Sequence, residues 1–136
     1  DYKFEIGKGV VLRDGKDLTI VATGLCVSEA LKAAEALAAE GVDAAVINIH
    51  TIKPIDEELL CEYAKKTGKV VTVEEHSILG GLGGAVCEKL SEKCPVPVKR
   101  IGIKDCFGES GPAAELIHKY GIDAEGITAQ IKEWLA

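Results

Sequence analysis

Short apolar segments that alternate with longer amphipathic segments are the feature that most constrains how this chain folds. Two apolar segments of strand length lie within residues 9–22, and three more span residues 44–49, 70–73 and 98–103. The segments between them carry apolar residues at helical spacing. Strands that alternate with helices are joined by right-handed crossovers. The sequence therefore predicts an α/β fold, a three-layer α/β/α sandwich around a mostly parallel sheet.

The pair Asp14-Gly15 interrupts the first apolar run. Asp-Gly between two apolar segments is typical of a tight hairpin turn, because both residues tolerate the backbone angles that such a turn requires. The sequence therefore predicts two hairpin-connected strands within residues 9–22. The first of them is expected to form an antiparallel edge of the sheet.

Start and stop signals mark the helices. Asp56 is an expected N-cap, followed by acidic residues in the first turn and by lysines before Gly68, an order that suits the helix dipole. Ser110 and Asp123 are the expected caps of two helices at the C-terminal end. The helices are therefore expected at residues 28–40 and 57–67, after the glycine turn 80–84, and after each of these two caps.

The chain length and the net charge limit the classes of protein to which this chain can belong. The 136 residues show no repeat, linker or low-complexity tract, so we expect one domain over residues 1–136. A net charge of −6 without a basic run argues against a nucleic-acid partner. The apolar stretches are too short to span a membrane. The chain begins at Asp1 and contains no Met, which fits a processed N-terminus or a piece of a longer protein.

The cysteines indicate neither disulfides nor zinc. Five cysteines form no CxxC pair, and an odd number cannot close a disulfide framework. The three histidines do not supply paired ligands either, so no metal site is expected. We interpret the cysteines as reduced, mostly buried thiols of a cytoplasmic protein; they are Cys26, Cys61, Cys87, Cys94 and Cys106.

Function in an open α/β sheet concentrates at the carboxyl ends of the strands. The richest of these ends is Glu74-Glu75-His76-Ser77. Neighbouring strand residues point to opposite faces, so these groups are not expected to converge on one substrate. His76 beside a carboxylate could act as a general acid or base. The favoured alternative is a structural group that makes a hydrogen bond across a domain interface.

The glycine-rich turn Gly80-Gly81-Leu82-Gly83-Gly84 follows this strand end. A dinucleotide motif needs a third glycine five residues after the first, and counting from Gly81 that position is Val86. No Gly-Lys-Ser/Thr follows, so a P-loop is excluded. We interpret the glycines as allowing a loop to pass closely over the sheet and a helix to pack on it. Weak anion binding at the helix N-terminus is the alternative.

Three other polar residues lie near expected strand or helix ends. His50 has the same ambiguity as His76, whereas His118 near a helix end is interpreted as a surface residue that the helix dipole stabilises. Cys26 lies at the start of a helix, where a thiolate can be stabilised. A buried, inert thiol is the favoured interpretation of Cys26.

Several longer runs resemble one family, the C-terminal domain of transketolase. They cover residues 18–24, 46–56, 71–83 and 97–111, and so extend over most of the chain. The likeness is closest to split transketolases, in which a separate C-terminal subunit carries this domain. The resemblance implies a five-stranded, mainly parallel sheet with one antiparallel strand. It also implies an enzyme of the pentose phosphate pathway that transfers a two-carbon ketol unit between sugar phosphates.

In that family thiamine diphosphate and Mg²⁺ are held by other domains. The resemblance therefore implies that this chain carries no catalytic, cofactor-binding or metal-binding residue and is inactive alone. Its partners would be the pyrimidine- and diphosphate-binding domains of a homodimeric enzyme. The residues that would line the active-site rim or contact another domain are Glu75, His76, Ser77, Gly80, Gly81, Gly83 and Gly84.

Two alternatives remain open at this point. Deoxyxylulose-5-phosphate synthase and the β subunits of 2-oxo acid dehydrogenases carry a similar domain, but Glu74-Glu75-His76-Ser77 and His50-Thr51 look more like transketolase. The other alternative is a free-standing module that binds a small ligand between the strand ends and Gly80–Gly84.

Overall fold

A computed structural model describes residues 8–24, 26–50, 55–77, 81–103 and 121–136. Of residues 75–77 it describes the backbone only. The predicted cap Ser110 and the residues Gly80, Cys106 and His118 lie outside the described residues. The elements are β1 (Val10–Arg13), β2 (Leu18–Ala22), α1 (Cys26–Ala39), β3 (Ala44–Asn48), α2 (Glu57–Thr67), β4 (Val70–Ser77), α3 (Gly81–Lys93), β5 (Val98–Ile103) and α5 (Ala124–Leu135).

The five strands form one sheet in the order β1-β3-β2-β4-β5. Strand β2 pairs in parallel with both β3 and β4, and β4 pairs in parallel with β5. The edge strand β1 runs antiparallel to β3. The predicted mostly parallel, five-stranded sheet with one antiparallel edge strand is therefore confirmed.

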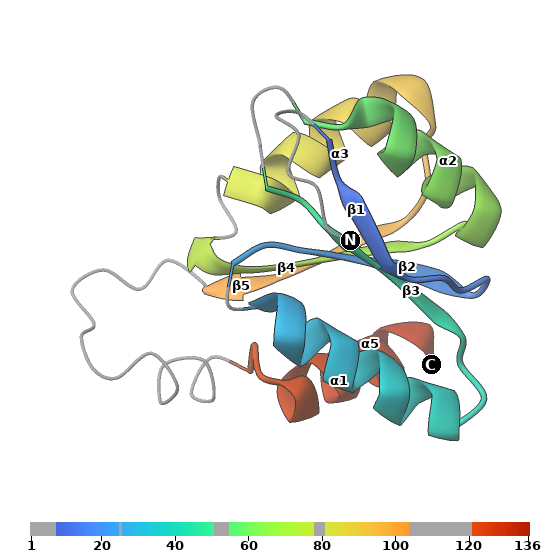
Figure 1. Ribbon diagram of the computed structural model, residues 1–136, viewed down its shortest axis with the longest axis vertical. Helices are drawn as coiled ribbons and strands as arrows, with labels where there is room; N and C mark the ends of the chain where they lie inside the picture. Colours follow the sequence, from blue (N-terminus) through green and yellow to red (C-terminus); the bar gives the residue numbers. More distant parts are fainter. Residues whose placement is uncertain (1–7, 25, 51–54, 78–80, 104–120) are drawn as a thin grey trace.

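Helices cover both faces of the sheet (Figure 1). Helices α1 and α5 pack on one face, where Ile20, Val71 and Ile101 join their buried residues. Helices α2 and α3 pack on the other, around Val21, Ile47 and Val70. All five residues of the central strand β2 are buried, as expected when both faces of a parallel strand are covered. The predicted three-layer sandwich is confirmed.

The capping signals are also confirmed. The Asp56 carboxylate accepts the N–H of Leu59 at 3.2 Å, and Gly68 ends α2 with a φ of 73°. The second carboxylate oxygen of Asp56 accepts the Gly9 N–H at 2.9 Å, so the same residue ties the start of β1 to α2. Asp123 caps α5 by accepting the Gly126 N–H. Each of the two aspartate caps satisfies a helix N–H that lacks an intrahelical partner.

The predicted pairing of β1 with β2 is wrong, because β1 pairs with β3 instead. After β1 the chain crosses the start of β3 at Gly15, which is buried. A Cβ at Gly15 would lie only 2.4 Å from the carbonyl carbon of Ala44, so only glycine allows this crossing. The crossing places β1 on the outer side of β3. Strand β2 then enters the sheet between β3 and β4.

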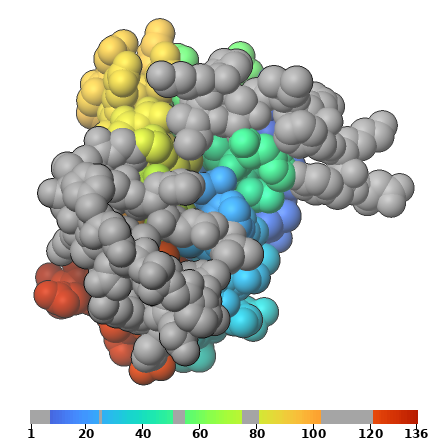
Figure 2. All heavy atoms as spheres, turned by 90° about the vertical axis from the view of Figure 1, so that its left-hand side faces the viewer, coloured from blue at the N-terminus to red at the C-terminus, as the bar shows by residue number. Residues whose placement is uncertain are grey.

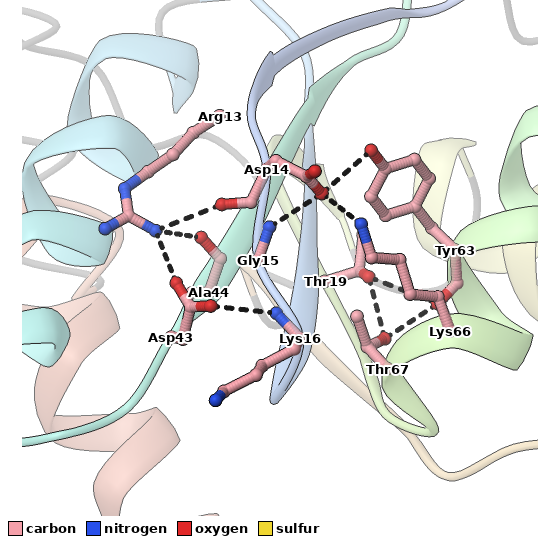
Figure 3. A network of polar contacts seen from close by, with 10 residues as sticks. All are labelled: Arg13, Asp14, Gly15, Lys16, Thr19, Asp43, Ala44, Tyr63, Lys66 and Thr67. Atoms are coloured by element: carbon pink, nitrogen blue, oxygen red, sulfur yellow. Dashed lines mark hydrogen bonds and ion pairs between the residues drawn. The ribbon is translucent and has the colours of Figure 1, made fainter.

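Side-chain contacts hold this crossing in place (Figure 3). Arg13 donates to the Ala44 carbonyl at 2.6 Å and to the Asp43 carboxylate at 3.2 Å. On the other side, the Asp14 carboxylate accepts hydrogen bonds from Tyr63 at 3.0 Å and from Lys66. The crossing is thus fastened both to β3 and to the last turns of α2.

The charges of this contact perturb one another. The hydrogen bond from Lys66, more than that from the Gly15 N–H, lowers the pKa of Asp14. The same bond to Asp14 raises the pKa of Lys66. A carboxyl group with a lowered folded-state pKa contributes stability above its ordinary pKa, and that contribution is lost as the pH falls through the folded-state value.

We predict that Lys66→Met lowers the urea midpoint of unfolding slightly at neutral pH, whereas Lys65→Met, on an exposed neighbour, does not. The difference between Lys66→Met and the wild type should be largest between about pH 5 and pH 9. It should fade in acid, as the pH falls through the lowered pKa of Asp14 and that carboxylate is protonated. Urea titrations across this range test it. Equal effects of the two substitutions, or a difference that persists in acid, would contradict the prediction.

The cysteines in the described part of the chain form no disulfide: Cys26 and Cys94 are buried, and Cys61 and Cys87 are half-buried. Burial raises the pKa of the Cys61 thiol. In the same part of the chain, no helix has both the length and the apolar composition needed to cross a membrane.

Candidate functional site

The connections of the sheet define where a site would lie. Helix α1 leads from β2 to β3, on one side of the sheet centre, and α3 leads from β4 to β5, on the other. The chain therefore diverges between the adjacent strands β2 and β4, the arrangement at which open α/β sheets bind their ligands. Figure 2 faces this carboxyl edge, with α3 in yellow above and α1 in blue to cyan below.

The carboxylate of Glu74 lies at the centre of this edge. Its residue is 1% exposed. The Leu82 N–H donates to Oε1 at 2.9 Å, and the Gly83 N–H donates to Oε2 at 2.6 Å. The positive end of a helix stabilises such a buried negative charge, and charge-assisted bonds of this length are among the stronger hydrogen bonds in proteins. Glu74 thus closes the N-terminus of α3 from a neighbouring strand.

The glycines of α3 make room for this carboxylate. Gly81 has a φ of 66°, and a Cβ there would lie 2.4 Å from Oε1 of Glu74. A Cβ at Gly83 would lie 3.1 Å from Oε2 and 3.0 Å from Cδ of Arg100 on β5. At Gly84, by contrast, a Cβ would meet nothing within 4 Å. The geometry supports the close-packing interpretation of Gly81 and Gly83. It does not support anion binding at Leu82 and Gly83, because their N–H groups already bind Glu74.

Strand β4 is irregular where these residues lie. Val73 pairs with Ile101, but the next pair is Ser77 with Ile103, so four positions along β4 face two along β5. Such bulges break the two-residue alternation and re-aim side chains, and they are frequent beside functional sites. Glu75 and His76 both lie within this irregular stretch of backbone, and the alternation expected of their side chains stays a prediction.

The predicted site residues come together along the backbone. Glu75, His76 and Ser77 form the last residues of β4, beside the first turn of α3, which contains Gly81, Gly83 and Gly84. The other predicted candidates lie apart from them: His50 is exposed after β3, and Cys26 is buried at the start of α1.

Glu74 is the residue of this edge whose contact the sequence did not predict. The predicted site residues of this strand end are the three that follow it. A signal was present, because an acidic residue eight positions before a Leu-Gly pair at a helix start can reach the free N–H groups of that helix.

In the described part of the chain, no group of three or more His, Cys, Asp or Glu residues is arranged to hold a metal ion.

The fold and the site together define an open α/β domain. Its central strand-end carboxylate, that of Glu74, is hydrogen-bonded to α3 of the same domain. Residues 7–127 match the family described as transketolase, C-terminal domain, and the chain belongs to that family.

Named relatives and a solved structure agree with this assignment. The chain is 51% identical over 131 residues to the 6-deoxy-6-sulfo-D-fructose transketolase subunit SqwH of Clostridium sp. (strain MSTE9), covering 96% of this chain and 41% of the relative. It is 53% identical to a putative transketolase C-terminal section of Methanocaldococcus jannaschii, covering 96% and 40%. A split-gene transketolase, solved as an inactive β4 tetramer, superimposes with a TM-score of 0.90 at 52% identity, covering 97% and 43%.

The chain thus spans about two fifths of the length of these relatives. A domain of the same kind occurs in 1-deoxy-D-xylulose-5-phosphate synthase 1 of Geobacter metallireducens, which is 46% identical over 132 residues, covering 96% of this chain and 21% of that protein.

We predict opposite effects of alanine at two glycines of α3. Gly81→Ala forces a left-handed backbone on alanine and displaces the Glu74 carboxylate, so the free energy of unfolding should fall by about 2 kcal/mol or more. Gly84→Ala meets open space and gains helix propensity, so stability should stay equal or rise by up to about 1 kcal/mol. Urea unfolding at neutral pH measures both. Equal stability of the two variants would show that Glu74 does not require the space at Gly81.

Proposed function

We propose that this chain is the C-terminal domain of a thiamine diphosphate-dependent transketolase and that it completes the enzyme structurally. The observation that supports this proposal most is that the strand-end carboxylate of Glu74 accepts hydrogen bonds from α3 and is not presented to a ligand. Thiamine diphosphate, with Mg²⁺, supplies the chemistry of two-carbon ketol transfer between sugar phosphates. The residues that hold both would come from the pyrimidine- and diphosphate-binding domains.

The role left to this chain is to pack against those domains and to help form the homodimer. The bulged end of β4 and the first turn of α3 lie together at the switch point of the sheet, where a neighbouring domain would meet them. Glu75, His76 and Ser77, with the glycines of α3, would then line the active-site rim or the interdomain contact. A cytoplasmic enzyme of the pentose phosphate pathway is the setting that this proposal implies.

Two alternative functions differ in how far the observations support them. The match to a deoxyxylulose-5-phosphate synthase keeps that enzyme as a second parent for this domain, next to the 2-oxo acid dehydrogenase β subunits. The donor and acceptor used by the complete enzyme would separate them. A free-standing ligand-binding module has less support: one hollow of about 350 Å³ lies between α1 and α5, lined by Ala36, Thr128 and Lys132 among others, away from the strand ends.

We predict that the 136-residue chain alone gives no calorimetric heat with thiamine diphosphate and Mg²⁺ at micromolar protein. The groups that hold the diphosphate and its metal would lie in the other domains. The complete enzyme, titrated under the same conditions, is the positive control. Saturable binding to the chain alone would contradict the proposed division of labour.

We predict that His76→Ala in the complete enzyme weakens substrate affinity or assembly modestly, by about three- to tenfold, because His76 would line the rim and not the reacting centre. His118→Ala, at a position interpreted as a surface residue, is the matched control. Steady-state kinetics and sedimentation measure the two effects. Loss of all turnover by an intact dimer would assign His76 to the chemistry itself.

A further inference from the structure

We infer that Glu74 is a positioning residue: its carboxylate holds the bulged end of β4, and with it Glu75 and His76, in the place where the complete enzyme uses them. This inference rests on the proposed function, because it concerns the same edge of the sheet. It assigns a task to a buried charge that the fold alone does not require. A hydrogen-bonding cap at the start of a helix need not come from a buried strand residue.

Because Glu74 is buried, its carboxylate requires close hydrogen-bond partners. An ionised carboxylate that is 1% exposed is stable only with close partners. Its two oxygens bind two successive N–H groups of α3, those of Leu82 and Gly83. A neutral amide of the same shape offers one acceptor oxygen and an NH₂ group, so it can satisfy only one of these two donors.

The position of Glu74 in β4 explains why its contact with α3 affects the neighbouring residues Glu75 and His76. The regular ladder with β5 holds as far as the pair Val73–Ile101 and resumes at the pair Ser77–Ile103. Glu74 is the first residue of the irregular stretch between these pairs, and Glu75 and His76 are the other two. The ladder holds this stretch at each end, and the side chain of Glu74 attaches it to α3 as well.

The first turn of α3 is built around the same attachment. Gly81 and Gly83 leave the space that the two carboxylate oxygens occupy, and the side chain of Arg100 borders the same space at Gly83. Arg100 is the register partner of Thr72, two residues before Glu74 on β4. Strand β5, the end of β4 and the start of α3 thus converge on one carboxylate. A shift of that carboxylate would shift the backbone of Glu75 and His76.

The test is Glu74→Gln in the complete enzyme, with Glu92→Gln as the matched control. Glu92 lies on the exposed side of α3, so the same chemical change there leaves the edge of the sheet intact. Glu74→Gln should lower kcat/KM by about three- to tenfold at a temperature where sedimentation shows an intact assembly. Unchanged kinetics with only a lower melting temperature would show a merely structural role and overturn the inference.

A double-mutant cycle with His76→Ala asks whether Glu74 acts through the bulge. If Glu74 positions His76, the double variant should be no slower than the slower single variant, because the second change removes nothing further. Independent effects, which multiply, would overturn the inference.

A spectroscopic readout keeps the inference separable from the proposed function. In NMR spectra of the 136-residue chain, Glu74→Gln should shift the backbone amides of Glu75 and His76, and Glu92→Gln should leave them in place. Unshifted amides in Glu74→Gln would overturn the positioning role. If the wild-type complete enzyme shows no ketol transfer, the proposed function fails, and these spectra still decide the positioning role.

Discussion

The bond between the Glu74 carboxylate and the first turn of α3 is the interaction on which the carboxyl edge of this domain depends. A buried carboxylate without partners would cost several kcal/mol, and a helix start without partners leaves N–H groups unsatisfied. Joining the two solves both problems at once. This contact requires glycine at position 81. At position 83 a Cβ would also lie close to the carboxylate, so glycine suits that position too. Gly81 and Gly83 of the glycine-rich turn are therefore a packing requirement of Glu74.

Much of the fold could be predicted from the sequence because its signals are local. The strand segments, the Asp56 and Asp123 caps and the Gly68 stop each depend on residues within a few positions of one another. The pairing of β1 could not be predicted, because the Asp14-Gly15 signal describes the turn and not the neighbour that the strand finally meets. That neighbour was decided by the close crossing of Gly15 over Ala44, a contact between residues far apart in the chain.

The candidate site was predictable as a region but not in its central residue. The rule that strand ends carry function led to the end of β4. The bulge at that strand end could not be predicted, since a bulge is a property of two paired strands and not of one segment. The contact of Glu74, however, left a signal in the sequence, since an acidic residue stands eight positions before the Leu-Gly pair of the helix start. The resemblance to transketolase, in contrast, rested on long runs of sequence, and the family match over residues 7–127 confirms it.

The central claim is that the Glu74 carboxylate holds the start of α3, and amide hydrogen exchange tests this claim most directly. By NMR, the amides of Leu82 and Gly83 in the wild-type chain should exchange at least about tenfold more slowly than the same amides in Glu74→Ala, while amides in the centre of β2 remain equally protected. Equal exchange at Leu82 and Gly83 in both proteins would contradict the account, because it would mean that the carboxylate does not hold the start of α3.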